Sequence, residues 1–87
     1  MVAQDKKVWF ITGISRGFGI EFARQVLAQG DVVVGTTRTG SSDLPSSDAL
    51  HVIKLDVSNE ADVHAAVNEG YKKYGRLDYV VNNAGCK

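Results

Sequence analysis

The sequence predicts an α/β fold with a parallel sheet, because short apolar runs alternate with amphipathic segments along its 87 residues. An apolar run at residues 8–11 leads at once into a glycine-rich turn at 13–19, and a segment of helical period follows to residue 29. A second apolar run then occupies residues 32–37. This strand, helix, strand order implies parallel neighbours joined by a crossover.

The first strand and helix are predicted from composition and period. Val8 to Ile11 is apolar and partly β-branched, which is typical of a strand buried on both faces. From Phe18 to Gln29 the apolar residues gather on one helical face, and Gly30 supplies a stop. The residues of that face are Phe22, Ala23, Val26 and Leu27.

The next two strands enclose a loop. Val32 to Thr37 has the composition of a buried strand, and a third strand starts near Leu50. The segment from Thr39 to Asp48 is rich in Ser, Asp, Gly and Pro, so the crossover there is predicted to be a loop or a degenerate helix. The third strand alternates in polarity from His51 onward, which favours a position at the sheet edge.

A second helix is predicted from Ser58, taken as the N-cap, to Gly75. Glu60 and Asp62 suit the positive end of its dipole. A fourth strand from Leu77 to Val81 follows. The predicted apolar stripe of the helix consists of Val63, Ala66, Val67, Tyr71 and Tyr74.

The order of the elements restricts the topology. Crossovers between parallel strands are right-handed. With the strand order 3-2-1-4, the first helix therefore covers one face of the sheet and the second helix covers the other. Eighty-seven residues suffice for one domain or part of one, and we expect residues 1–87 to be a single unit.

Composition excludes several classes of function. Ten basic residues balance ten acidic ones, so no positive field favours nucleic acid or an anionic membrane surface. No stretch approaches the ~20 apolar residues of a membrane span. The single cysteine, Cys86, cannot form an internal disulfide, and a cytoplasmic location is expected. His51 and His64 are far apart in the sequence, which gives a metal site little support.

The glycine-rich turn predicts a site for a dinucleotide diphosphate. Gly13 permits a tight turn, Gly17 leaves room for the phosphates, and Gly19 lets the helix pack near the strand. Amides around Phe18, at the helix N-terminus, would bind the anion. The spacing is Gly-x-x-x-Gly-x-Gly, which is not the commonest fingerprint, but the flanking strand and helix support the interpretation.

At this point the chain resembles the short-chain dehydrogenase/reductase family. The resemblance rests on Thr12-Gly13-x-x-x-Gly17-x-Gly19 after the first strand and on Asn-Asn-Ala-Gly after the fourth, and it covers almost the whole chain. It implies a Rossmann-like fold of which residues 1–87 are the N-terminal, NAD(P)-binding part, truncated after the fourth strand. It also implies that Asp56 and Val57 contact the adenine. The resemblance places three further residues beside the ribose: Asn83, Ala84 and Gly85.

The end of the second strand bears on the choice of cofactor. NAD-binding proteins of this kind offer a carboxylate there to the ribose hydroxyls. This chain instead reads Thr36-Thr37-Arg38, and a second arginine, Arg16, follows Ser15 inside the turn. Guanidinium groups suit a phosphate, so NADP(H) is expected rather than NAD(H).

No catalytic residue can be assigned within the chain. The family's catalytic Ser and Tyr-x-x-x-Lys lie beyond the fourth strand, and Tyr71 does not start such a motif because position 75 is Gly. The resemblance implies a parent oxidoreductase that transfers hydride between NADP(H) and a small carbonyl or alcohol, with these 87 residues inactive alone. The alternative is a freestanding nucleotide-binding or interaction module. Because one edge of residues 79–81 is open, we expect the isolated chain to be unstable, oligomeric or part of a longer product, and a homo-oligomer is the expected assembly.

Overall fold

The computed structural model contains six regular elements in the expected α/β order. Their bounds are β1 (Val8–Thr12), α1 (Gly17–Ala28), β2 (Val32–Thr37), β3 (Leu50–Lys54), α2 (Glu60–Tyr74) and β4 (Tyr79–Val81). The residues that the structure describes are 6–14, 17–40, 42, 44, 45, 47–55 and 59–82.

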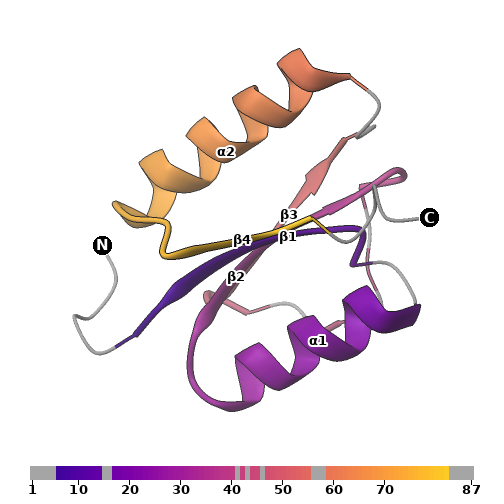
Figure 1. The fold of residues 1–87 in the computed structure, drawn as a ribbon. Coiled ribbons are helices and arrows are strands. Elements are labelled where there is room, and N and C mark those ends of the chain that lie inside the picture. The colour runs from indigo at the N-terminus through magenta and orange to yellow at the C-terminus, as the bar shows by residue number, and fades with distance from the viewer. Residues whose placement is uncertain are drawn as a thin grey trace.

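The four strands form one parallel sheet in the order β3-β2-β1-β4, as predicted. Phe10 in β1 aligns with Val34 in β2 on one side and with Val80 in β4 on the other. Figure 1 shows α1 on one face of the sheet and α2 on the opposite face. Right-handed crossovers require this arrangement, because β2 and β3 are added on one side of β1 and β4 is added on the other.

Two apolar clusters fill the spaces between the sheet and its helices, because successive strand residues point to opposite faces. On the α2 face, Phe10 and Val34 pack with Ala66 and Tyr74. On the α1 face, Ile11 and Val33 belong to a cluster whose other buried residues are Ile14, Ile20, Ala23, Val26 and Leu44. The apolar residues on the two faces of β1 and β2 therefore belong to two separate cores.

The described part of the crossover from β2 to β3 is irregular, as the Ser- and Asp-rich composition predicts. Its described residues contain no helix. Leu44 nevertheless is buried, with 6% of its surface exposed, and packs into the α1-side cluster. The β3 strand lies at the sheet edge, in agreement with its alternating pattern.

The N-cap of α2 differs from the prediction. Asn59, not Ser58, occupies the cap, and its side-chain oxygen accepts hydrogen bonds from the amides of Ala61 and Asp62. Both residue types suit an N-cap, and the register of the helix start selects Asn59. At the other end Gly75 adopts φ +80° as the C-cap, as predicted.

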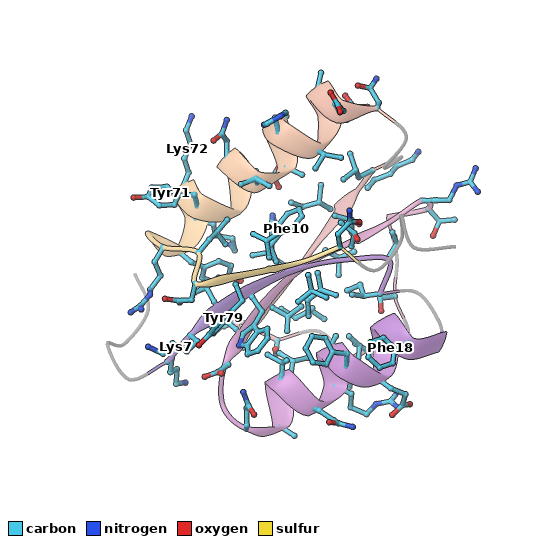
Figure 2. The ribbon with its side chains drawn as sticks, in the orientation of Figure 1. Lys7, Phe10, Phe18, Tyr71, Lys72 and Tyr79 are labelled. Carbon is cyan, nitrogen blue, oxygen red and sulfur yellow. The ribbon has the colours of Figure 1, made fainter. Side chains whose placement is uncertain are left out.

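Two further expectations need correction. The helical period predicts Tyr71 in the apolar stripe of α2, but its surface is 56% exposed, and Figure 2 shows it on the outer side of the helix. Of the two tyrosines, only Tyr74 lies in the core, and its hydroxyl donates to the carbonyl of Asp48. Regular pairing of β4 begins at Tyr79 and not at Leu77. This is because the Val8 amide donates its hydrogen bond to the carboxylate of Asp78, in the place that a main-chain carbonyl of β4 would otherwise take.

The outer edge of β4 carries apolar surface in the described part of the chain. Tyr79 and Val80 are 46% and 62% exposed, and among the described strands β4 pairs with β1 alone. Neither described helix combines the length and apolar character needed to cross a bilayer.

Candidate nucleotide-binding site

The turn between β1 and α1 has the backbone geometry that its glycines predict. Gly13 and Gly17 have φ angles of +73° and +66°, in the left-handed region that residues with a Cβ rarely adopt. A Cβ at Gly17 would meet no atom within 4 Å, so the backbone conformation, not a steric contact inside the chain, requires glycine there. Ser15 and Arg16, predicted members of this site, lie outside the described residues.

The start of the turn is fastened to the end of β2. The amides of Gly13 and Ile14 both donate to the carbonyl of Thr36 at 3.0 Å, and the Gly13 amide is also 3.2 Å from the Thr36 hydroxyl. From the far side, the Ser42 hydroxyl donates to the carbonyl of Ile14 at 2.9 Å. These contacts hold Gly13 and Ile14 between the end of β2 and the crossover that follows β2.

The amides suited to an anion therefore lie at the beginning of α1. The first N–H groups of a helix have no acceptor within it. In α1 these belong to residues from Gly17 onward, and the first turn of this helix carries no acidic side chain. In α2, by contrast, Asn59 caps the first amides, and Glu60 and Asp62 lie in the first turn. The positive end of the α1 dipole is thus the one suited to phosphate.

Phe18 and Gly19 take opposite positions at this helix start. Gly19 is buried, which agrees with its predicted role in close packing against the sheet. Phe18 is 71% exposed and stacks on Phe22 with the ring centroids 5.8 Å apart. Figure 2 places Phe18 at the outer end of α1. Phe18 can therefore offer an anion only its main-chain amide, because its ring packs on Phe22.

The end of β2 provides the second part of the site. Thr36 and Thr37 are buried, whereas Arg38, Thr39 and Gly40 are exposed. The Gly40 amide donates to the Thr37 hydroxyl at 2.8 Å, which closes a tight bend directly after the strand. Arg38 thus stands at the tip of β2, and the described residues place no carboxylate in an ion pair with it.

The end of β4 lies next to the end of β1. The hydroxyl of Thr12 donates to Oδ1 of Asn82 at 3.3 Å and joins the two strand ends. A cavity of about 390 Å³ lies under the first half of α2, near the carboxyl ends of β1 and β4. Its lining consists of Phe10, Thr12, Glu60, Val63, His64, Val80 and Asn82.

The structure brings together five of the predicted site residues at the carboxyl edge of the sheet, which is the edge where open α/β sheets bind ligands. They are Gly13, Gly17, Phe18, Gly19 and Arg38. The other predicted contacts to adenine and ribose lie outside the described residues: Asp56, Val57, Asn83, Ala84 and Gly85.

Sequence reasoning missed Thr36, Ser42 and the cavity. No motif marks either hydroxyl residue, because their contacts join segments distant in the sequence. Within the described ranges, no three His, Cys, Asp or Glu side chains are arranged to hold a metal ion.

The carboxylates with lowered pKa values lie at the opposite, amino edge of the sheet. Hydrogen bonds from Arg76, and then from the Val8 amide, hold the pKa of Asp78 below its usual value. The pKa of Asp31 is lowered in the same direction, chiefly by the Lys7 amide. These carboxylates fasten the start of β1 and are structural. The carboxyl edge, in contrast, offers amides and Arg38.

Comparison with known proteins agrees with this geometry. A family model described as short chain dehydrogenase matches residues 7–87. Oxidoreductase BOA17 of Botryotinia fuckeliana is 40% identical over 84 residues, which are 91% of this chain and 31% of that protein. A 3-ketodihydrosphingosine reductase of Bacteroides thetaiotaomicron is 35% identical over 79 residues, or 91% of this chain and 28% of the reductase. The chain thus spans about a third of the length of these relatives.

Solved structures show the same relationship. A short-chain dehydrogenase from Streptomyces avermitilis superposes with a TM-score of 0.83 at 34% identity, over 94% of this chain and 32% of that one. A 3-ketoacyl-(acyl-carrier-protein) reductase from Brucella melitensis, complexed with NADH, gives 0.75 at 34% identity, over 85% of this chain and 32% of the reductase. Because the family model covers nearly the whole chain and the fold has the same architecture, the protein belongs to the short-chain dehydrogenase family.

Proposed function

We propose that this chain is the NADP(H)-binding part of an oxidoreductase that transfers hydride between NADP(H) and a carbonyl or alcohol substrate. The relatives named as reductases of 3-ketodihydrosphingosine and of ketoacyl groups support a carbonyl substrate. The catalytic residues are proposed to lie outside residues 1–87, since no residue here matches the family's Tyr-x-x-x-Lys pair.

The observation that carries the cofactor assignment is the exposed Arg38 at the tip of β2, where a carboxylate would suit NAD(H). Thr36, two residues earlier, accepts hydrogen bonds from the Gly13 and Ile14 amides, so the end of β2 is held against the glycine turn. A dinucleotide with its diphosphate at the N-terminus of α1 would bring its adenosine ribose toward Arg38. A guanidinium there favours a 2′-phosphate over a free hydroxyl.

The remaining site residues are assigned by the same proposal. The amides and side chains of Gly13, Ser15, Arg16, Gly17, Phe18 and Gly19 hold the diphosphate, with Arg16 assisting Arg38. Asp56 and Val57 contact the adenine, and Asn83, Ala84 and Gly85 border the ribose. The exposed apolar edge of β4 needs a covering strand or subunit, and we propose a homo-oligomer. The single cysteine is consistent with a cytoplasmic protein.

The test compares affinities for two cofactors in the full-length protein that carries these residues. For Arg38→Gln, the Kd for NADPH should rise about tenfold or more, since a charge-assisted hydrogen bond contributes ~1.5–3 kcal/mol. The Kd for NADH should be nearly unchanged, and Arg38→Asp should have the larger effect. Arg24→Gln, an exposed arginine on α1 paired with Glu21, is the matched control. Equal losses for both cofactors would reject the assignment.

A further inference from the structure

We propose that Lys54, the last residue of β3, is a second cation for the 2′-phosphate of the cofactor and so determines cofactor specificity together with Arg38. The inference rests on the proposed function and assigns a residue that no motif indicates. It depends on three properties of Lys54: its register, its face of the sheet and its contact with the bend after β2.

The register places Lys54 beside the residue that precedes Arg38. Thr37 and Lys54 are Cα partners in the parallel pairing of β2 and β3, and the Leu55 amide donates to the Thr37 carbonyl at 2.9 Å. Neighbouring strands are ~4.8 Å apart, so the backbone of Lys54 lies one strand spacing from the tip of β2. The two cations thus leave the sheet at adjacent strand ends.

Lys54 lies on the same face of the sheet as the glycine turn. Leu50 and Val52, four and two residues earlier in β3, pack against the α1-side cluster. Because side chains alternate along a strand, Lys54 continues this face. Ile14, inside the glycine turn, belongs to the same cluster. The Lys54 side chain therefore leaves β3 on the same face of the sheet as the glycine turn that follows β1.

The bend after β2 rests on the aliphatic part of Lys54. A Cβ built at Gly40 would lie 3.3 Å from Cβ of Lys54, 3.7 Å from its Cγ and 3.8 Å from its Cδ. The side of Gly40 that a Cβ would occupy thus faces the lysine stem, and the Thr37 hydroxyl holds this glycine through its amide. This packing restricts the stem and keeps the charged end near the exposed 38–40 bend, as lysines do when their methylenes cover a surface.

Both cations lack a carboxylate partner in the described part of the chain. The ion pairs found there involve Arg24, His51 and Arg76, not Arg38 or Lys54. Two like charges at neighbouring strand ends repel each other unless an anion lies between them. A phosphate ester on the adenosine ribose supplies that anion, whereas the ribose hydroxyls of NAD(H) do not.

A lysine on an edge strand has another recognised use, which is to prevent edge-to-edge pairing of sheets. That role does not depend on whether the cofactor carries a 2′-phosphate. Two ligands that differ only in the 2′-phosphate therefore separate the two roles, because only phosphate binding by Lys54 makes their affinities respond differently to its substitution. Adenosine 2′,5′-bisphosphate and adenosine 5′-monophosphate are suitable probes, together with NADPH and NADH.

The experiment measures Kd for these four ligands in full-length Lys54→Gln, Lys54→Arg and Arg38→Gln proteins. Lys72→Gln is the control, because Lys72 lies in the last turn of α2, at the opposite end of the molecule from the tip of β2 (Figure 2). For Lys54→Gln we expect Kd to rise about three- to fivefold for NADPH and the bisphosphate, as for a partly screened ion pair. NADH and the monophosphate should bind as before, and Lys54→Arg should retain the preference.

The outcomes distinguish this inference from the function on which it rests. If Arg38→Gln loses the preference for NADPH and Lys54→Gln keeps it, the role of Lys54 is overturned and the proposed function stands. If neither variant changes the preference, both fail. Because Lys54 is exposed, Lys54→Gln should retain the wild-type melting temperature, and equal weakening of all four ligands would also count against the inference.

Discussion

The side chain of Ile14 fills the space directly above Gly35, so the glycine turn packs on a strand residue that has no side chain. A Cβ at Gly35 would overlap Cδ1 of Ile14 and lie 2.7 Å from its Cγ1. Gly35→Ala should therefore displace Ile14 and the amides that follow it. We expect the free energy of unfolding to fall by about 1–3 kcal/mol, as for other overpacked cores, and Kd for NADPH to rise. Denaturant titration and cofactor titration measure the two effects.

A second-site change tests whether Ile14 causes that loss. Ile14→Val removes Cδ1, the atom nearest to the added methyl group, and should cost about 0.5–1.5 kcal/mol alone. In the double variant the two losses should be less than additive, because the smaller valine side chain makes room for the methyl group introduced by Gly35→Ala. Strict additivity of the unfolding free energies would show that the substitution at Gly35 acts by another route.

Ser42 fastens the β2–β3 crossover to the glycine turn through the Ile14 carbonyl. Ser42→Ala should lower stability by about 0.5–1.5 kcal/mol, the net contribution of a typical hydrogen bond. It should also weaken NADPH and NADH alike, because we propose that the turn binds the diphosphate, which both cofactors contain. Ser47→Ala is the matched control, since its hydroxyl accepts from the Ala49 amide and does not contact the turn. Unchanged affinity for both cofactors in Ser42→Ala would contradict a role in positioning the turn.

The sequence is sufficient to predict the sheet order, both helices and the placement of the glycine turn and Arg38 at the carboxyl edge of the sheet, because each depends on local period or on a short motif. β1 and β2 are apolar for most of their length, and α1 has a single apolar face, so burial can be read from neighbouring residues. Gly13 permits the predicted tight turn with a positive φ angle, and Gly17 has a similar conformation. These features require no knowledge of distant contacts.

The remaining features depend on contacts between segments that are far apart in the sequence. Nothing near Ser42 indicates that its hydroxyl reaches Ile14, and nothing in β3 marks Lys54 as a neighbour of the 38–40 bend. The helical period assigns Tyr71 to the core because one turn separates it from Val67, but the ring stays exposed on the outer side of the helix. Tertiary packing decides such positions.

The cap of α2 gives a prediction that depends on one side chain. Asn59 accepts from the amides of Ala61 at 3.0 Å and Asp62 at 3.3 Å. Asn59→Ala leaves both donors to water and should reduce the free energy of unfolding by about 1 kcal/mol. Asn68→Ala, in the exposed interior of the same helix, should be neutral or slightly stabilising because alanine has the higher helix propensity. A similar loss for both would place the effect outside the cap.

Asp78 predicts how stability changes in acid. Its Oδ1 accepts from the Arg76 guanidinium at 2.6 Å and its Oδ2 from the Val8 amide at 2.7 Å, so the pKa in the folded state lies below the ordinary 3.8. A lowered carboxylate pKa stabilises the fold at every pH above the unfolded-state value, and that contribution is lost as the pH falls from there through the folded-state pKa. The wild-type protein should therefore lose stability below about pH 4.

Asp78→Asn separates this contribution from general acid denaturation. At pH 7 the variant should be less stable by about 1–2 kcal/mol, because an amide cannot accept both sets of hydrogen bonds and leaves Arg76 without its countercharge. As the pH falls through the lowered pKa of Asp78, the two unfolding free energies should converge, since the wild-type carboxyl also becomes neutral. Asp48→Asn, an exposed carboxylate on the crossover, controls for net charge. A difference between wild type and Asp78→Asn that stays constant down to about pH 2 would mean that the charge of Asp78 contributes nothing to holding β4 against β1.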